Sequence, residues 1–416
     1  MIGSRTKQWN AVTLGEIIDI FDHVRIPLNS AQRSERKGPY PYYGASGIID
    51  GVDDFLFDGE YILVAEDGEN LNSRKLPVAF PARGRFWVNN HAHIIKGKKG
   101  VADDRFLMAW FANADIKGYI TGAAQPKLSQ GNLKRIALSV PPLATQRKIA
   151  GVLSAYDDLI ENNTRRIAIL EEMAQAIYRE WFVHFRFPGH ESAHFTDSPF
   201  GKIPEGWKAS FSDYVEFLEG PGLRRWQYRD DGIPFLNIRT IGNNDIDLSK
   251  CQFIDPAEVS QKYSHFLLRP LDHIVSSSGT IGRIATVQNH HLPLMLNTSI
   301  IRMAPRTSAV GRWQLKHFLQ SPYFQEQIVA HASGVAQMNF GPSHLKLMWI
   351  IAPDEKTGLA YEHFVGEMEN LLCLLVKKNK ILRATRDLLL PKLVSGQLDV
   401  EDLDIDAGEL QTETLA

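Results

Sequence analysis

The sequence lacks most of the features that mark secreted and membrane proteins. Only two of its 416 residues are cysteines, Cys251 and Cys373, so no disulfide framework is expected and a reducing compartment fits. The first residues are not followed by the apolar core of a signal peptide, and no apolar run is long enough to span a bilayer. We therefore expect a cytoplasmic protein without membrane contact.

Signatures of common catalytic sites are also missing. There is no Gly-x-x-x-x-Gly-Lys-Ser/Thr phosphate cradle and no Gly-rich strand-to-helix turn for S-adenosylmethionine or a dinucleotide. Asp354 and Glu355 are contiguous, whereas catalytic metal ligands converge from separate strands. His91 and His93 have no carboxylate or cysteine cluster at ligand spacing. No catalytic residue, metal or cofactor is predicted in this chain.

A strong positive charge is absent as well. The formal net charge is -2, whereas a protein that grips nucleic acid alone is usually basic. A DNA-binding function would therefore need a local basic face, or partners that share the phosphate contacts.

Two long stretches, residues 144–183 and 356–396, dominate what is present. Apolar residues recur in them at alternating steps of four and three, the heptad pattern of a coiled coil, and each stretch predicts a helix roughly 55–60 Å long. Because such a rod cannot bury its seam inside one small domain, we expect the two helices to pack together. The predicted seam consists of Ile149, Leu153, Tyr156, Ile160, Asn163, Ile167, Leu170, Ile177, Val365, Met368, Leu372, Leu375, Asn379, Leu382 and Leu389.

One asparagine interrupts each seam, Asn163 in the first helix and Asn379 in the second. A polar residue in an apolar seam costs stability and can fix the register of a coiled coil. Two arrangements stay open: the two amides meet across the helix pair, or each points to the seam edge and is solvated.

The helices belong to an internal duplication. At one constant offset, Pro141 maps onto Pro353, Thr145 onto Thr357, and the loop 122–125 onto 334–337. Both threonines are predicted helix N-caps. The ends of the two globular pieces match while their interiors diverge, which predicts a common role for the ends and different recognition by the interiors.

The predicted fold class is α+β, with two globular domains in a pseudo-twofold repeat, separated by two long antiparallel coiled-coil helices. The expected segments are a first domain (1–143), a first spacer helix (144–183), a linker (184–206), a second domain (207–355), a second spacer helix (356–396) and an acidic mobile tail (397–416).

Side chains that could contact DNA lie in both globular pieces. Arginine can pair with guanine and asparagine with adenine, although a solvated surface position or a packed turn explains each residue as well. The candidates are Asn70, Asn72, Arg74, Lys75, Arg83, Arg85, Asn89, Asn90, Gln125 and Lys127 in the first piece, and Arg224, Arg225, Arg229, Asn237, Arg239, Ser276, Ser277, Ser278, Gln337 and Asn339 in the second.

Six motifs, in this order and combined with the duplication, give a resemblance over nearly the whole chain. The chain resembles the specificity (S) subunit family of type I restriction–modification systems, with one departure at residues 353–358, where the usual second proline and the glutamine of the helix entry are missing. The motifs are residues 42–51, 59–68, 126–129, 141–150, 276–282 and 390–398.

The resemblance implies a non-catalytic, sequence-specific subunit that reads a bipartite DNA target, one recognition domain for each half-site. The helices would serve as a ruler and as a docking surface for two methyltransferase (M) subunits, with restriction/translocase (R) subunits as further partners. S-adenosylmethionine, ATP and Mg²⁺ would be used by those partners. Two alternatives stay open: a fused or orphan DNA methyltransferase or endonuclease, and a coiled-coil scaffold that binds only protein.

Overall fold

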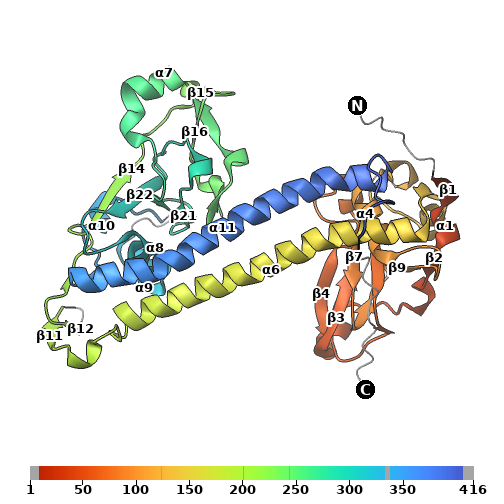
Figure 1. Ribbon diagram of the computed structural model, residues 1–416, viewed down its shortest axis with the longest axis horizontal. Coiled ribbons are helices and arrows are strands. Elements are labelled where there is room, and N and C mark those ends of the chain that lie inside the picture. The colour runs from red at the N-terminus through yellow and green to blue at the C-terminus, as the bar shows by residue number, and fades with distance from the viewer. Residues whose placement is uncertain (1–8, 123, 200, 243, 333–337, 406–416) are drawn as a thin grey trace. The chain divides into compact units, whose positions relative to one another are not determined.

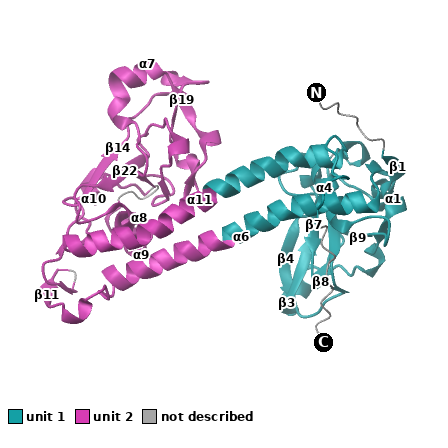
Figure 2. Ribbon diagram, in the orientation of Figure 1, with its two compact units in different colours: residues 1–164, 377–416 teal, residues 165–376 magenta. Residues whose placement is uncertain are grey.

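The structure is a computed structural model that describes residues 9–122, 124–199, 201–242, 244–332 and 338–405. The chain divides into two compact units (Figure 2): unit 1 comprises residues 1–164 and 377–416, and unit 2 comprises residues 165–376. Both long helices, α6 (Leu143–Phe182) and α11 (Glu355–Val394), are labelled in Figure 1, and each contributes one part to each unit (Figure 2). Within the described ranges, no helix combines the length and the apolar character that crossing a membrane requires.

The same strand topology occurs in both units. Unit 1 has a β1–β10 pair and an antiparallel sheet of order β2–β9–β6–β7; unit 2 has a β13–β23 pair and an antiparallel sheet of order β14–β22–β20–β21. This repeat confirms the duplication and the α+β fold. The strands are β1 (Asn10–Thr13), β2 (Ile18–Ile20), β6 (Tyr61–Ala65), β7 (Ala79–Ala82), β9 (Ala92–Gly97), β10 (Ala137–Val140), β13 (Lys208–Ala209), β14 (Val215–Glu219), β20 (His273–Ser276), β21 (Ile284–Thr286), β22 (Ile300–Pro305) and β23 (Ile351–Ala352).

The interiors of the units differ, as the sequence predicts. Unit 1 inserts a four-stranded sheet of order β4–β3–β8–β5, in which β3 and β8 are parallel. Unit 2 inserts a three-stranded sheet of order β15–β19–β16 and the pair β17–β18. The inserted strands are β3 (Lys37–Gly44), β4 (Gly47–Val52), β5 (Phe57–Asp58), β8 (Arg85–Val88), β15 (Tyr228–Arg229), β16 (Ile233–Phe235), β17 (Ile241–Gly242), β18 (Asp245–Ile246) and β19 (Gln252–Ile254).

Each unit builds its core from its sheet, its short helices and its part of the long helices. In unit 1, α4 (Asp104–Asn113) buries Phe106 and Phe111 in a cluster that also contains Leu153 and Leu393. In unit 2, α8 (Arg312–Gln320) and α9 (Pro322–His331) join a cluster that contains Trp181. The long helices are therefore part of both cores.

The long helices run antiparallel within each unit. In unit 1, Asp157 pairs with Arg386 at 2.6 Å; in unit 2, the rings of Phe182 and Tyr361 lie 4.8 Å apart. Every predicted seam residue is buried or half-buried. The two seam asparagines meet in unit 1: Asn163 Nδ2 donates to Asn379 Oδ1 at 2.9 Å.

The predicted N-cap positions are wrong, although the predicted helix ranges, 144–183 and 356–396, differ from the observed ones by only one or two residues at each end. α6 begins at Leu143 and α11 at Glu355, so Thr145 and Thr357 lie inside their helices. Asp354 occupies the position before α11, and its carboxylate accepts from Thr357 N at 3.0 Å. An aspartate in this position satisfies the unpaired amides of the first turn and favours the helix dipole.

The linker and tail predictions also need correction. Residues 184–206 contain the pair β11 (Phe195–Ser198) and β12 (Gly201–Pro204), and the rings of Phe187 and Trp207 pack against each other with centroids 4.9 Å apart. Of the tail, residues 397–405 pack on α6: Val400 is buried, and Lys148 Nζ donates to Glu401 O at 2.7 Å. Apolar side chains inside polar segments explain both errors. Residues 406–416 lie outside the described ranges.

Candidate nucleic-acid interface

Three of the predicted DNA contacts in unit 1 hold the fold together instead. The Arg74 guanidinium donates to Ala114 O at 2.6 Å, beyond the end of α4, where backbone carbonyls lack helical partners. The Asn70 side chain closes its loop by two hydrogen bonds with the backbone of Leu76: its Nδ2 donates to Leu76 O, and its Oδ1 accepts from Leu76 N. Asn89 is buried, and its Oδ1 accepts from His91 N at 2.8 Å. None of these three presents a free base-reading edge.

The other candidates of the unit 1 insert are exposed. Arg83 pairs with Glu60 at 3.4 Å, and Arg85 pairs with Asp58 at 3.1 Å. Exposed ion pairs of this kind contribute little stability, so a phosphate can replace the carboxylate at small cost. The remaining exposed candidates are Asn72, Lys75, Asn90, Gln125 and Lys127.

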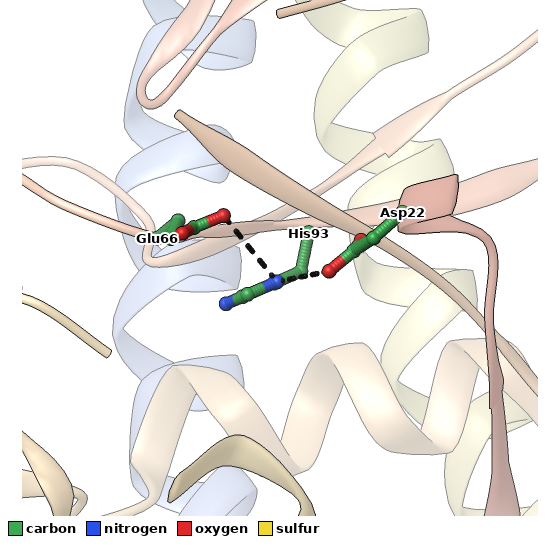
Figure 3. A group of neighbouring side chains, drawn as sticks. All are labelled: Asp22, Glu66 and His93. Atoms are coloured by element: carbon green, nitrogen blue, oxygen red, sulfur yellow. Dashed lines mark hydrogen bonds and ion pairs between the residues drawn. The ribbon is translucent and has the colours of Figure 1, made fainter. Parts of the chain in front are cut away.

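Lys127 pairs with Glu66, a member of a buried ionic cluster that could not be predicted from the sequence. The cluster consists of Asp22, Glu66 and His93 (Figure 3). Asp22 precedes the insert, Glu66 follows β6 and His93 lies on β9. His93 Nδ1 lies 2.6 Å from Asp22 Oδ2 and 3.7 Å from Glu66 Oε2, while His93 Nε2 lies 2.7 Å from the Leu128 carbonyl oxygen. Burial raises the pKa of Asp22, but the hydrogen bond and charge of His93, the hydrogen bond from Ile94 N and the charge of Arg25 together outweigh it, so the pKa lies below the usual value.

This cluster is the one grouping of three potential metal ligands in the described part of the chain. Its carboxylates are already matched by cations: Arg25 lies 2.8 Å from Glu66, and Lys127 lies 3.2 Å from Glu66. The arrangement therefore suits an internal ion-pair network better than a cation site. Because Leu128 N also donates to Glu66 O at 2.7 Å, the network anchors the loop that carries Gln125 and Lys127.

Only part of the corresponding loop of unit 2 lies within the described residues. Gln337 lies outside the described residues, and Asn339 is exposed and bridges to Ser278. Ser276 and Ser277 are buried, and Ser276 Oγ donates to Thr280 O at 2.7 Å, so they shape the turn after β20 rather than face DNA. Their burial argues against the predicted DNA contact, because Ser276 ends a core strand and Ser277 follows it directly.

The arginines predicted in unit 2 lie on the surface of its insert. Arg224, Arg225, Arg229 and Arg239 are exposed, and between them Trp226 is 73% exposed. The sequence prediction omitted Trp226, although an Arg-Arg-Trp run is a recognisable signal for nucleic-acid contact.

Two cavities open on the surface of unit 2. One, of about 410 Å³, is lined by Tyr228, Asn237, Ile238, Arg239, Lys250, Gln252, Asn297 and Ser299. The larger, of about 750 Å³, is lined by acidic as well as basic side chains, among them Glu171, Glu172 and Arg283. Since DNA is a polyanion, the smaller cavity, which has no acidic lining residue, suits it better.

Known proteins resemble this chain in sequence and in fold. The model of the type I restriction modification DNA specificity domain matches residues 6–172. A type I restriction enzyme specificity subunit of Haemophilus influenzae is 30% identical over 65% of this chain and 66% of its own length. The MjaVIII specificity subunit of Methanocaldococcus jannaschii is 21% identical over 96% of this chain and 95% of its own length.

One solved structure supports the fold. The S subunit of a type I restriction–modification system from M. genitalium matches with a TM-score of 0.62, at 15% identity, over 94% of this chain and 97% of its own. The duplicated topology, the paired helices and these similarities agree. The chain belongs to the family of type I restriction–modification specificity subunits.

Proposed function

We propose that the chain is the non-catalytic DNA-reading subunit of a type I restriction–modification complex, with one unit for each half of a bipartite target. The observation that carries this proposal is the combination of repeated sheets with divergent inserts. Because both units contain the same sheet, we propose that both perform the same task, the reading of a half-site. Because their inserts differ, each unit is proposed to read a different base sequence.

The long helices are proposed to set the distance between the two half-sites. Each contains 40 residues, which corresponds to roughly 60 Å of helix. Removing the matched heptads 164–170 and 372–378, which lie next to the Asn163–Asn379 pair, would shorten the helices by roughly 10 Å, or about three base pairs. We expect methylome sequencing to show a changed spacer between two unchanged half-sites. An unchanged spacer would refute the ruler.

Docking of methyltransferase subunits is proposed on the outer faces of the helices. In unit 1, Ile381 and Leu388 are 57% and 68% exposed, one heptad apart on α11; in unit 2, Phe364 and Leu371 are 57% and 37% exposed at the same spacing. Exposed apolar residues at heptad spacing favour amphipathic helices as partners. Accordingly, we expect Leu388→Glu to abolish co-elution with the methyltransferase subunit while the unfolding midpoint stays unchanged; Lys380→Glu, at an exposed polar position, is the control.

The alternatives make different predictions. A fused methyltransferase would bind S-adenosylmethionine alone, and an orphan nuclease would cut DNA with Mg²⁺ alone. A protein-only scaffold would give no sequence-selective protection of DNA in complex with the methyltransferase. Calorimetry with S-adenosylmethionine and footprinting with the methyltransferase complex separate these possibilities.

A further inference from the structure

Most of the lining of the smaller cavity comes from the insert that unit 1 does not share, and Asn297 and Ser299 come from the segment just before β22. Tyr228 on β15 and Gln252 on β19 line one part of it, and Asn237 and Arg239 line another. If the two units read different sequences, the residues responsible must lie in such unshared parts.

Two of the lining residues are already occupied by the fold. Asn237 Nδ2 donates to Lys250 O at 2.9 Å, and its Oδ1 accepts from Arg239 N at 2.8 Å, so Asn237 fixes the cavity wall. Lys250 Nζ lies 2.8 Å from Asp247 Oδ2, which neutralises its charge. These residues position the wall and are not expected to read bases.

Other polar groups of the cavity remain unused. Arg239 and Gln252 are exposed, and across the described ranges neither side chain has a hydrogen-bond or ion-pair partner in the protein. The Asn297 amide is half satisfied, since its Oδ1 accepts from Thr298 N at 2.7 Å. The cavity thus offers the Arg239 guanidinium and the Gln252 amide, both without a partner among the residues that the structure describes. These two groups can form bidentate hydrogen bonds with guanine and adenine edges, respectively.

We propose that Arg239 and Gln252 are specificity-determining residues of unit 2, which contact a guanine and an adenine edge in the major groove of one half-site. This assignment rests on the proposed function of the chain. Asn237 is their positioning residue, because it holds both the backbone of Arg239 and the carbonyl of Lys250. Arg224 and Arg225, which are exposed beside Trp226, are assigned to phosphates rather than bases.

The test uses the full chain in complex with its methyltransferase subunits. Binding is measured by competition between the native bipartite duplex and a set of duplexes with one base pair changed at a time. Arg239→Ala should weaken binding to the native duplex roughly 5- to 100-fold and abolish discrimination at one guanine of one half-site. Gln252→Ala should do the same at one adenine. Discrimination at the other half-site should not change.

Three further variants make the outcome specific. Arg239→Lys keeps the positive charge but lacks the paired N–H donors of the guanidinium. This variant should therefore keep the salt-dependent affinity and still lose base discrimination. Arg225→Ala should weaken binding equally for all duplexes and reduce its salt dependence. Asn237→Ala should relax both positions at once. Because Arg239 and Gln252 are exposed, their variants should keep the wild-type unfolding midpoint.

The proposed function and the assignment of this cavity can be refuted separately. A wild-type complex that selects no bipartite sequence would refute the proposed function. A selective wild-type complex whose Arg239→Ala and Gln252→Ala variants discriminate every base pair as before would overturn only the assignment of this cavity.

Discussion

The asparagine pair in the helix seam gives the sharpest test of how the helices are held. Asn163 and Asn379 are 4% and 2% exposed. Besides accepting from Asn163, Asn379 donates to Ile160 O at 3.2 Å and to Thr164 Oγ1 at 3.1 Å. Replacing only Asn163 by leucine would leave Asn379 Oδ1 buried without a donor, which costs about 1–3 kcal/mol.

Replacing both asparagines should have a different effect. Asn163→Leu/Asn379→Leu removes both polar groups together, so we expect stability near or above that of the wild type. The coupling between the two sites should therefore reach about 1–3 kcal/mol. Asn162→Leu, at the neighbouring exposed position, is the control and should change stability by less than about 0.5 kcal/mol.

Two measurements check this prediction. Chemical denaturation followed by circular dichroism gives the free energies of the four members of the cycle. Methylome sequencing gives the spacer, which should be unique in the wild type and relaxed in the double variant, because the polar pair no longer fixes register. Additive single effects, or a double variant less stable than both single variants, would refute the reasoning.

Two other predictions follow from the cores of the units. Burial lowers the pKa of His317, and lowers that of His273 to about 3, so unit 2 should lose stability as the pH falls below 6.5, and His273 should account for about 1.4 kcal/mol of the loss per pH unit. Below pH 4.5 the loss should steepen: burial raises the pKa of Glu369, but the hydrogen bonds and charges of His317 and Lys316 together outweigh it and lower that pKa to about 2. Denaturation from pH 7 to 4 checks the first window, and an unchanged slope in His273→Gln would contradict it. In unit 1, Arg74→Ala should cost about 1.5–3 kcal/mol without changing base discrimination; a stable variant with altered discrimination would restore Arg74 as a DNA contact.

The long helices and the duplication could be predicted because both appear as regular spacings of residues along the sequence. The heptad seam repeats every few residues, and Pro141 and Pro353 precede equivalent helices. The meeting of Asn163 with Asn379 could not, because it depends on the register between segments far apart in the chain.

The candidate interface was harder to predict for a related reason. Residue type alone does not show whether a side chain faces DNA. Arg74 binds a backbone carbonyl after α4, and Ser276 is buried in a strand. Asp22, Glu66 and His93 converge only after three separate segments fold together. Gln252 was missed because a single glutamine on a short strand carries no local signal.

The division of the chain has a consequence for its synthesis on the ribosome. All of unit 2 lies within one continuous segment, whereas unit 1 needs residues 377–394 of α11 to cover Ile149 and Leu153. Domains usually mature in the order in which they emerge. In this chain unit 2 can finish folding first, and the apolar stripe of unit 1 that contains Ile149 and Leu153 stays exposed until residues 377–394 have emerged.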